Sequence, residues 1–330
     1  MISPAYTILP KMASESKTAI YAALVGNLAI AITKLIAASI TGSSAMLSEA
    51  IHSIVDTGNE GLLLLGLHRS KRQADVEHPY GHGRELYFWS LIVALGIFAV
   101  GGGISLYEGI SHILDPEPMT DPFWNYVVLA FAFLFEGVSW IFGWRAFRAT
   151  KGNQGILEAV HTSKDPTTFI VTFEDTGALL GLVIAFCGVY LGHTLNNPYL
   201  DGAASVAIGL MLSLMSAFLA YETKGLLIGE GYPRSTLKRL RELIATDPGV
   251  EHVNRVLTLF LGPEEVMLTV ELRFRRELSA AEVRTSIARV KELVREKYPE
   301  IKRIYFAAES LSDDDRAKEE EIEHDSSLVG

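Results

Sequence analysis

Long runs of apolar residues alternate with short polar segments up to about residue 230. Six runs are long enough for a helix that crosses a bilayer, which needs about 20 mainly apolar residues. Turn-forming residues separate them, as in “SHILDPEPMTDPFWN” between the third and fourth runs. The pattern predicts an α-helical membrane protein with six transmembrane helices. They are Thr18–Thr41, Met46–Leu67, Tyr87–Ile110, Asn125–Phe147, Thr167–Leu191 and Leu200–Leu227.

The segment after Gly231 has the periodicities of a small α+β domain. “STLKRLRELIATD” predicts an amphipathic helix with Ser235 as its N-cap. “VNRVLTLFLG” and “EVMLTVELRF” alternate on either side of Gly262, which predicts a β-hairpin. “SAAEVRTSIARVKELVREKYP” predicts a second capped helix, and “IKRIYFAA” predicts a last strand. The order αββαβ favours a ferredoxin-like domain.

These patterns divide the chain into four parts. Residues 1–16 form an N-terminal segment, 17–230 the six-helix membrane domain and 231–311 the small domain. Residues 312–330 are acidic and poor in apolar residues, so we expect a disordered tail.

Positive charge predicts the orientation of the helices. Among the five connections between the predicted spans, Lys and Arg are found only in those after the second and the fourth span. By the positive-inside rule these two loops and both termini lie in the cytoplasm. No transit peptide is evident, so we expect a bacterial cell membrane. The residues are His68, Arg69, Lys71, Arg72 and Arg84 after the second span, and Arg145, Arg148, Lys151 and Lys164 after the fourth.

Composition excludes other classes of protein. The chain has 330 residues, 49% of them hydrophobic, and a formal charge of −10 that owes much to the acidic tail. Without a basic surplus, nucleic acid is not expected as a partner. The single cysteine, Cys187, excludes an internal disulfide and a thiolate metal cluster.

Ionisable residues lie in the middle of two predicted membrane helices. His52 and Asp56 are four residues apart and therefore share a helix face, about 10–17 Å from the outer end of the second span. Glu174 and Asp175 lie about 11–12 Å from the cytoplasmic end of the fifth span. In an apolar layer about 30 Å thick, the two groups can meet at one level.

Unpaired carboxylates at that depth are costly, and intramembrane ionisable residues indicate function. Several carboxylates do not neutralise one another, so they need protons or a cation. One imidazole with carboxylates suits a divalent metal such as zinc. We predict a metal site of His52, Asp56 and Asp175, with Glu174 as a candidate fourth ligand. The alternative is that these groups are protonated and serve helix packing.

Three further positions carry candidate roles. In the loop “ADVEHPYGHGRE”, Asp75, His78 and His82 can gather around one cation, the alternative being a loop held by histidine hydrogen bonds. Lys34 in the first span is expected to pair with a carboxylate. Asp201 opens the sixth span and either caps that helix or lies on the exit route, and we favour the cap.

Several motifs resemble one transporter family. “GSSAMLSEAIHSIVDTGNE”, “DVEHPYGHGRELYFWSL” and “LDGAASVAIGLML” are similar to motifs of the cation diffusion facilitator (CDF) family, over Thr18 to Leu311. “FEDTGALLG” and “YEGISHILDPEP” most resemble the mitochondrial zinc transporter branch and its bacterial relatives. The resemblance implies homodimeric exporters that exchange Zn²⁺ or related ions for protons, without a prosthetic group. Dimer contacts are expected in the cytoplasmic domain and in the membrane.

The family pattern implies roles for particular residues. His52, Asp56 and Asp175 match its transport site, while Val171 stands where the usual pattern has a histidine. A more oxygen-rich site broadens selectivity toward Mn²⁺, Fe²⁺ or Co²⁺. The family's loop site matches the Asp75–His78–His82 cluster. The last strand lacks histidine and only His252 lies near, so we expect residues 231–311 to dimerise with little or no metal.

The sequence therefore predicts a proton-coupled exporter of divalent metal that works by alternating access, and not an enzyme. An intramembrane metalloenzyme is an alternative, but the chain lacks an HExxH motif and a clear nucleophile. A passive divalent-cation channel is a third possibility. A pH gradient would not drive uphill metal movement through such a channel.

Overall fold

The computed structural model describes residues 27–116, 123–152 and 154–307. The predicted segment 1–16 and the predicted tail 312–330 lie outside these ranges. The chain divides after Ile228 into two compact units, which are described separately below.

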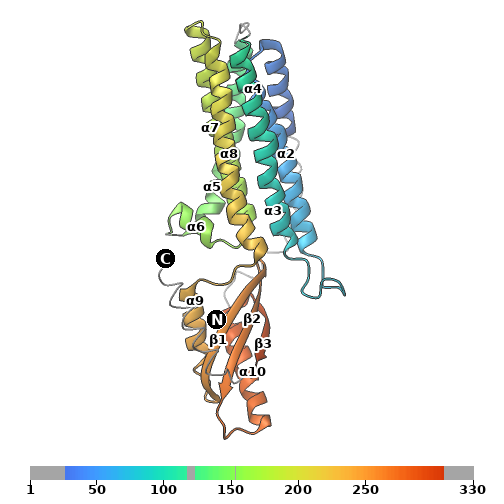
Figure 1. Cartoon of the computed structure of the whole chain (residues 1–330), viewed down its shortest axis with the longest axis vertical. Coiled ribbons are helices and arrows are strands. Elements are labelled where there is room, and N and C mark those ends of the chain that lie inside the picture. The colour runs from blue at the N-terminus through green and yellow to red at the C-terminus, as the bar shows by residue number, and fades with distance from the viewer. Residues whose placement is uncertain (1–26, 117–122, 153, 308–330) are drawn as a thin grey trace. The chain divides into compact units, whose positions relative to one another are not determined.

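The first unit is a bundle of long helices that run along one another (Figure 1). The helix Asn27–Thr41 ends at Gly42, whose φ of +70° is the left-handed conformation that closes many helices. The Gly42 amide donates to the Ala38 carbonyl over 2.9 Å. The following elements are α2 Ser44–Ser70, α3 Glu85–Gly96, the π-helical turn η2 Ile97–Gly102, α4 Gly103–Leu114, α5 Phe123–Lys151, α6 Ile156–Thr162, α7 Pro166–Thr194 and α8 Tyr199–Ile228.

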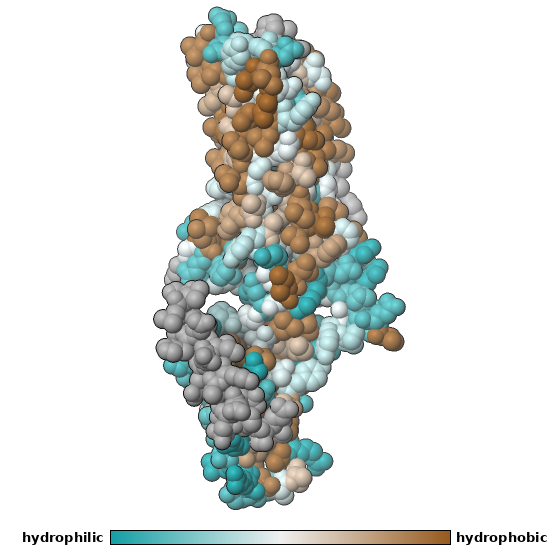
Figure 2. Space-filling model, viewed as in Figure 1, coloured by the Kyte–Doolittle hydropathy of each residue, from teal (hydrophilic) through white to brown (hydrophobic). Residues whose placement is uncertain are grey.

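Four helical runs among the described residues are long and apolar enough to cross a membrane. Apolar side chains cover much of the surface of this unit in the view of Figure 2. The runs are Glu85–Leu114, Phe123–Ala149, Pro166–Thr194 and Tyr199–Ile228.

The other two predicted spans are less clear by composition. Helix α2 has 27 residues but carries the carboxylates of Glu49, Asp56 and Glu60. The first predicted span is described only as the shorter apolar helix Asn27–Thr41. The chain is thus a helical membrane protein with four clear apolar helices, and the count of six spans stays a prediction.

Helices α4 and α8 pack through glycines. A Cβ atom added to Gly109 would lie 2.6 Å from the Val206 amide nitrogen and 2.8 Å from the Gly202 carbonyl oxygen. One added to Gly209 would lie 2.7 Å from the Leu106 amide nitrogen. Small residues allow this backbone contact, and close packing is a main source of helix association where lipid provides no hydrophobic driving force.

The second unit has the predicted order αββαβ. β1 pairs antiparallel with β2, with Val256 opposite Val270, and β2 pairs parallel with β3, with Leu268 opposite Ile304. Alternate strand residues point toward α9 and α10 and bury a core that includes Leu240, Val290 and Val294. The elements are α9 Arg234–Ile244, β1 Val250–Gly262, β2 Glu265–Phe274, α10 Ala280–Lys297 and β3 Ile301–Ala307.

The two helices of this unit begin differently. Ser279 caps α10, and Glu282 reaches back to the Ser279 amide, so the predicted serine cap there is confirmed. The predicted cap at Ser235 is wrong, because α9 begins at Arg234 and its N-cap is Pro233, two residues earlier. The fixed φ of proline suits a helix start without a side-chain cap.

Gly109→Ala is expected to destabilise the protein, because the added methyl group meets backbone atoms that cannot move aside. Overpacking of this kind costs about 1–3 kcal/mol. The measurement is the melting temperature in detergent. The control is Gly137→Ala, where nothing lies within 4 Å of the added atom. Equal melting temperatures for the two variants would contradict backbone contact between α4 and α8.

Candidate metal transport site

The start of α2 is fixed by a carboxylate from α8. The Asp201 side chain accepts hydrogen bonds from the Ser43 hydroxyl (2.7 Å) and from the backbone amides of Ser44 (2.6 Å) and Ala45 (3.3 Å). These amides have no partner within the helix, and negative charge is favourable there. The prediction that Asp201 caps the sixth span is wrong, because α8 begins two residues earlier, at Tyr199, and the Asp201 carboxylate caps α2 instead. This contact sets the position of α2 against α8.

Two turns further along α2, His52 and Asp56 lie together. The His52 Nδ1 atom is 3.2 Å from the Asp56 Oδ1 atom. The imidazole is fully buried, and neither of its nitrogens makes a hydrogen bond within the described residues. A buried imidazole nitrogen without a partner is costly. Such atoms fit a group that takes a ligand.

The neighbouring carboxylates of α7 diverge, because consecutive helix residues point about 100° apart. Glu174 is buried, accepts a hydrogen bond from the Asn59 amide of α2 (2.6 Å) and also lies against Asp56. Asp175 turns toward α5 and accepts from the Ser139 hydroxyl (3.2 Å). Of the two, Glu174 is therefore the one that contacts Asp56.

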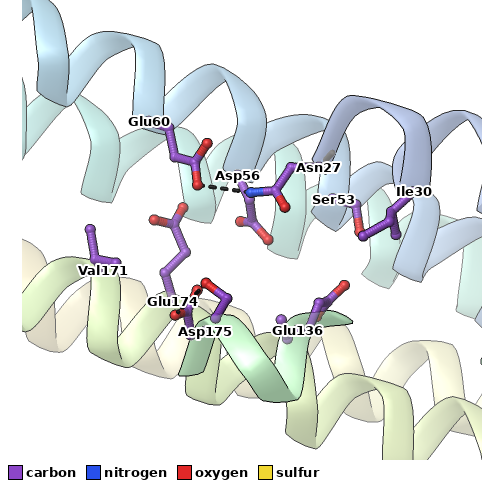
Figure 3. A pocket seen from close by; sticks show the side chains of 11 residues that line it. Asn27, Ile30, Ser53, Asp56, Glu60, Glu136, Val171, Glu174 and Asp175 are labelled. Atoms are coloured by element: carbon purple, nitrogen blue, oxygen red, sulfur yellow. Dashed lines mark hydrogen bonds between the residues drawn. The ribbon is translucent and has the colours of Figure 1, made fainter. Parts of the chain in front are cut away.

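A cavity of about 30 Å³ joins these groups, which is large enough to hold a water molecule. Figure 3 shows Asp56 and Glu60 facing Glu174 across it, with Asp175 and Glu136 on the same side as Glu174. His52 does not line the cavity and meets it through Asp56. The lining residues are Asn27, Ile30, Ser53, Asp56, Glu60, Glu136, Ser139, Val171, Glu174, Asp175 and Ala178.

The structure adds one carboxylate that the sequence reasoning did not single out. Glu60 accepts a hydrogen bond from the Asn27 amide (2.8 Å) and lines the same cavity. Its position four residues after Asp56 places it on the same helix face, which is the signal that could have found it.

The donor set suits a divalent cation. Three carboxylates from two helices, Asp56, Glu174 and Asp175, surround a small space inside an apolar bundle. Oxygen ligands with one nearby imidazole match the preferences of zinc and of harder divalent ions. The metal is cargo for such a site.

A buried charge cluster lies beside the cavity. The Lys34 ammonium group is 2.8 Å from the Glu136 Oε1 atom and 3.2 Å from the Glu49 Oε2 atom, and it donates to the Ser53 hydroxyl (2.8 Å). The predicted pairing of Lys34 with a carboxylate is confirmed.

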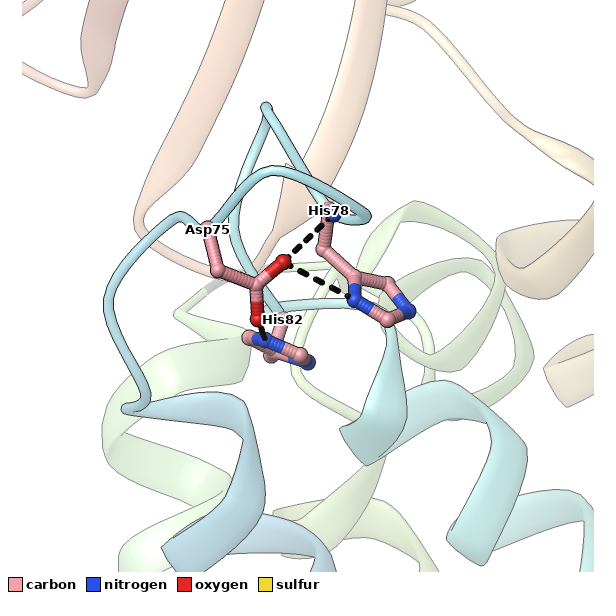
Figure 4. A group of neighbouring side chains, drawn as sticks. All are labelled: Asp75, His78 and His82. Atoms are coloured by element: carbon pink, nitrogen blue, oxygen red, sulfur yellow. Dashed lines mark hydrogen bonds and ion pairs between the residues drawn. The ribbon is translucent and has the colours of Figure 1, made fainter.

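The predicted loop cluster is assembled between α2 and α3. The Asp75 carboxylate accepts from the His78 backbone amide (2.6 Å) and lies 3.2 Å from the His78 Nδ1 atom and 3.0 Å from the His82 Nε2 atom. One ligand atom from each residue lies within 4.8 Å of the others (Figure 4). Gly81, with a φ of +83°, lets the chain turn back between the two histidines.

The loop geometry keeps Asp75 charged. Hydrogen bonds, first from the His78 amide and then from the His82 ring, hold the pKa of Asp75 at about 2. A carboxylate whose pKa is lowered in the folded state contributes stability above its unfolded value, and this contribution is lost as the pH falls through about 2. Asp75 is therefore ionised throughout the physiological range.

Residues 20–228 match the model of the cation efflux transmembrane domain. The chain belongs to the cation efflux family. Members of this family are transporters, so the chain is not an enzyme. The match covers the helical unit, including α2, α7 and the cavity between them.

Curated relatives agree with the mitochondrial zinc transporter branch. The proton-coupled zinc antiporter SLC30A9, mitochondrial, of Homo sapiens is 37% identical over 73% of this chain and 43% of its own length. Metal tolerance protein C4 of Arabidopsis thaliana is 28% identical over 72% of this chain and 52% of that protein. The cation-efflux pump FieF of Escherichia coli is 24% identical over 86% of this chain and 89% of that protein. The chain thus spans less than half the length of the SLC30A9 proteins that it matches.

Among solved structures, the MamM C-terminal domain in a nickel form matches 24% of this chain and 100% of that chain, with 18% identity. The TM-score is 0.22. A likeness at that score carries no argument about this chain.

The expected bacterial cell membrane is wrong. The SLC30A9 relatives, from mouse to frog, carry mitochondrial in their names, which points to a mitochondrial membrane. The expectation was based on the absence of an evident transit peptide, and this absence does not identify the membrane.

Asp75→Asn is expected to weaken Zn²⁺ binding by the loop by about tenfold or more, because a neutral amide replaces the charged group between the histidines. The ratio of dissociation constants between variant and parent is expected to be equal at about pH 6 and about pH 7.5, since Asp75 is ionised at both. Calorimetry in an Asp56→Ala background isolates the loop from the transport site.

The control is Glu77→Gln, which removes a carboxylate of the same loop that is not part of the cluster. Equal losses in the two variants, or a ratio that changes with pH, would argue against Asp75 as the charged ligand.

Proposed function

We propose that this protein exports a divalent metal ion, first of all Zn²⁺, in exchange for protons and by alternating access. The observation that carries the proposal is the meeting of Asp56, Glu174 and Asp175 in one small cavity, with His52 in contact with Asp56. The similarity to SLC30A9, a proton-coupled zinc antiporter, supports the same function.

The proposed setting is a mitochondrial membrane crossed by six helices. Besides the four clear spans, α2 and the helix that contains Asn27–Thr41 complete the count. The basic residues in the last turns of α2 and α5 and in the loops that follow put those loops, both termini and residues 231–311 on the side from which metal is taken. We propose a homodimer, formed through residues 231–311 and through membrane helices.

The cavity supplies a physical reason for exchange. Asp56 and Glu174 lie against each other inside the bundle, and two carboxylates in contact share either protons or a cation, because their charges otherwise repel. Arrival of a metal ion displaces protons from these groups, since ligands bind metal in their deprotonated forms. When the cavity opens to the other side, protons compete for the same oxygens and release the ion.

The proposed metal ligands have different roles around the ion. Asp56 and Glu174 are proposed as the central pair, and Asp175 joins from the α5 side of the cavity. His52 reaches the ion through a small rotation or holds Asp56 in position. The loop cluster Asp75–His78–His82 is proposed as a second metal site near the entrance, also built from hard and borderline donors.

An oxygen-rich site discriminates weakly between divalent ions. Val171 lines the cavity at the position where the family pattern usually has a histidine. With fewer nitrogen ligands, Mn²⁺, Fe²⁺ and Co²⁺ become alternative cargo.

Asp56→Ala is expected to reduce zinc-driven proton movement in proteoliposomes by about tenfold or more, because the cavity loses its central α2 carboxylate. A pH-sensitive dye inside the vesicles reports proton flux, and a zinc dye reports metal.

The control is Glu222→Gln, which removes a carboxylate that contacts His161 and does not line the cavity. Unchanged proton flux in Asp56→Ala would overturn the site assignment. Zinc movement that ignores an imposed pH gradient in the parent protein would indicate a passive channel instead.

Val171→His is expected to raise the preference for Zn²⁺ over Mn²⁺ by about tenfold, since an added imidazole favours zinc. Competition between the two ions in the same transport assay measures the preference. Val171→Leu fills similar space without a nitrogen and serves as control. A preference that moves equally in both variants would mean that side-chain volume, and not ligation, sets selectivity.

A further inference from the structure

Lys34 is held by two glutamates that come from different helices. Its ammonium group pairs with Glu49 of α2 and with Glu136 of α5, and its side chain is fully buried. One positive and two negative charges leave one negative charge in excess in this cluster. The excess requires a further cation or proton, because an uncompensated buried charge is strongly unfavourable.

The Glu49 carboxylate is enclosed by the protein. Its side chain is fully buried, and it does not line the cavity. Its Oε1 atom has no hydrogen bond within the described residues either, but it lies directly against α7, where a Cβ atom added to Gly181 would overlap it. Glu49 is therefore packed as a fixed partner of Lys34.

The Glu136 carboxylate is placed differently, because it lines the cavity that holds Asp56, Glu174 and Asp175. Its Oε1 atom is fixed by Lys34, while its Oε2 atom is buried and has no hydrogen bond to any residue that the structure describes. Figure 3 shows Glu136 entering the cavity region from the same side as Asp175. One oxygen is thus held in place and the other is free to bind.

A carboxylate with one oxygen fixed by a cation is a preorganised ligand for a metal ion. The fixed side removes the entropy cost of ordering the side chain, and the free side offers a lone pair inside a water-poor space. The excess negative charge of the Lys34 cluster acts in the same direction, because it favours the arrival of a dication.

We infer that Glu136 is a further ligand of the transported ion, supplied by α5, and that it provides the charged donor that Val171 cannot provide. The inference rests on the proposed function of the Asp56 site. It assigns three helices, α2, α5 and α7, to one cargo site. It also assigns the site a preference for divalent cations that accept several oxygen ligands.

The test is a pair of matched variants, Glu136→Gln and Glu49→Gln. Each variant removes the negative charge of one of the two glutamates that contact the Lys34 ammonium group, but of the two only Glu136 lines the cavity. Zn²⁺ and Mn²⁺ binding to the full chain in nanodiscs is measured by calorimetry, with Asp75→Asn in the background to silence the loop. We expect Glu136→Gln to weaken binding of both ions by about tenfold or more, with the larger loss for Mn²⁺, and Glu49→Gln to change it by less than about threefold.

Equal dissociation constants for the two variants overturn the inference. The variant Asp56→Ala separates failure of the proposed function from failure of the proposed role of Glu136. If it abolishes binding while Glu136→Gln leaves binding intact, the proposed function stands and the role of Glu136 falls. If Asp56→Ala itself leaves binding intact, the proposed function falls.

Should Glu136→Gln fail to fold, Glu136→Asp keeps the charge near Lys34 and withdraws the carboxylate by about 1.5 Å. The readout is the visible spectrum of bound Co²⁺, which responds to the number and kind of ligands. A changed spectrum in Glu136→Asp supports ligation, and a spectrum identical to that of the parent protein contradicts it.

Discussion

Charged groups inside the helical bundle have to find partners within the protein, because the hydrocarbon layer offers none. Most of the buried charges described above meet this requirement. Lys34 has Glu49, Glu136 and Ser53, and Asp201 has the amide groups at the start of α2. The region around His52 and Asp56 does not meet it, since both imidazole nitrogens and one oxygen of Asp56 lack hydrogen bonds within the described residues. The same shortage of partners extends to one oxygen each of Glu49 and Glu136, beside this region.

The satisfied pairs also give the site its shape. Asp201 anchors the first turn of α2 to α8, and Lys34 connects the helix Asn27–Thr41 to α2 and α5. The Asp201 contact with α2 and the Lys34–Glu136 pair join helices that are distant in the sequence. The cavity between α2, α5 and α7 is thus bounded by helices whose relative positions are set by polar contacts as well as by apolar packing.

Much of the arrangement could be predicted from spacing alone. The four-residue interval between His52 and Asp56 places them on one face, and the alternation after Gly231 gives the order of helices and strands in the small unit. Periodicity gives the face of a helix but not the neighbour that covers it. For that reason the capping of α2 by Asp201 could not be predicted, and the spacing of Glu60 from Asp56 indicates a shared helix face but not the cavity that the two residues line. The adjacent residues Glu174 and Asp175 show the same limit: the helix sets the angle of about 100° between them, but the partner that each one meets depends on where α2 and α5 lie.

The glycine contact between α4 and α8 has a mechanical consequence. Where Gly109 and Gly209 bring two backbones together, no layer of side chains is left to deform as the helices slide. Helices α4 and α8 are therefore expected to move together as one rigid body. Rearrangements of the cavity are therefore expected to move the surrounding helices relative to this pair, with the start of α2 held to α8 by Asp201.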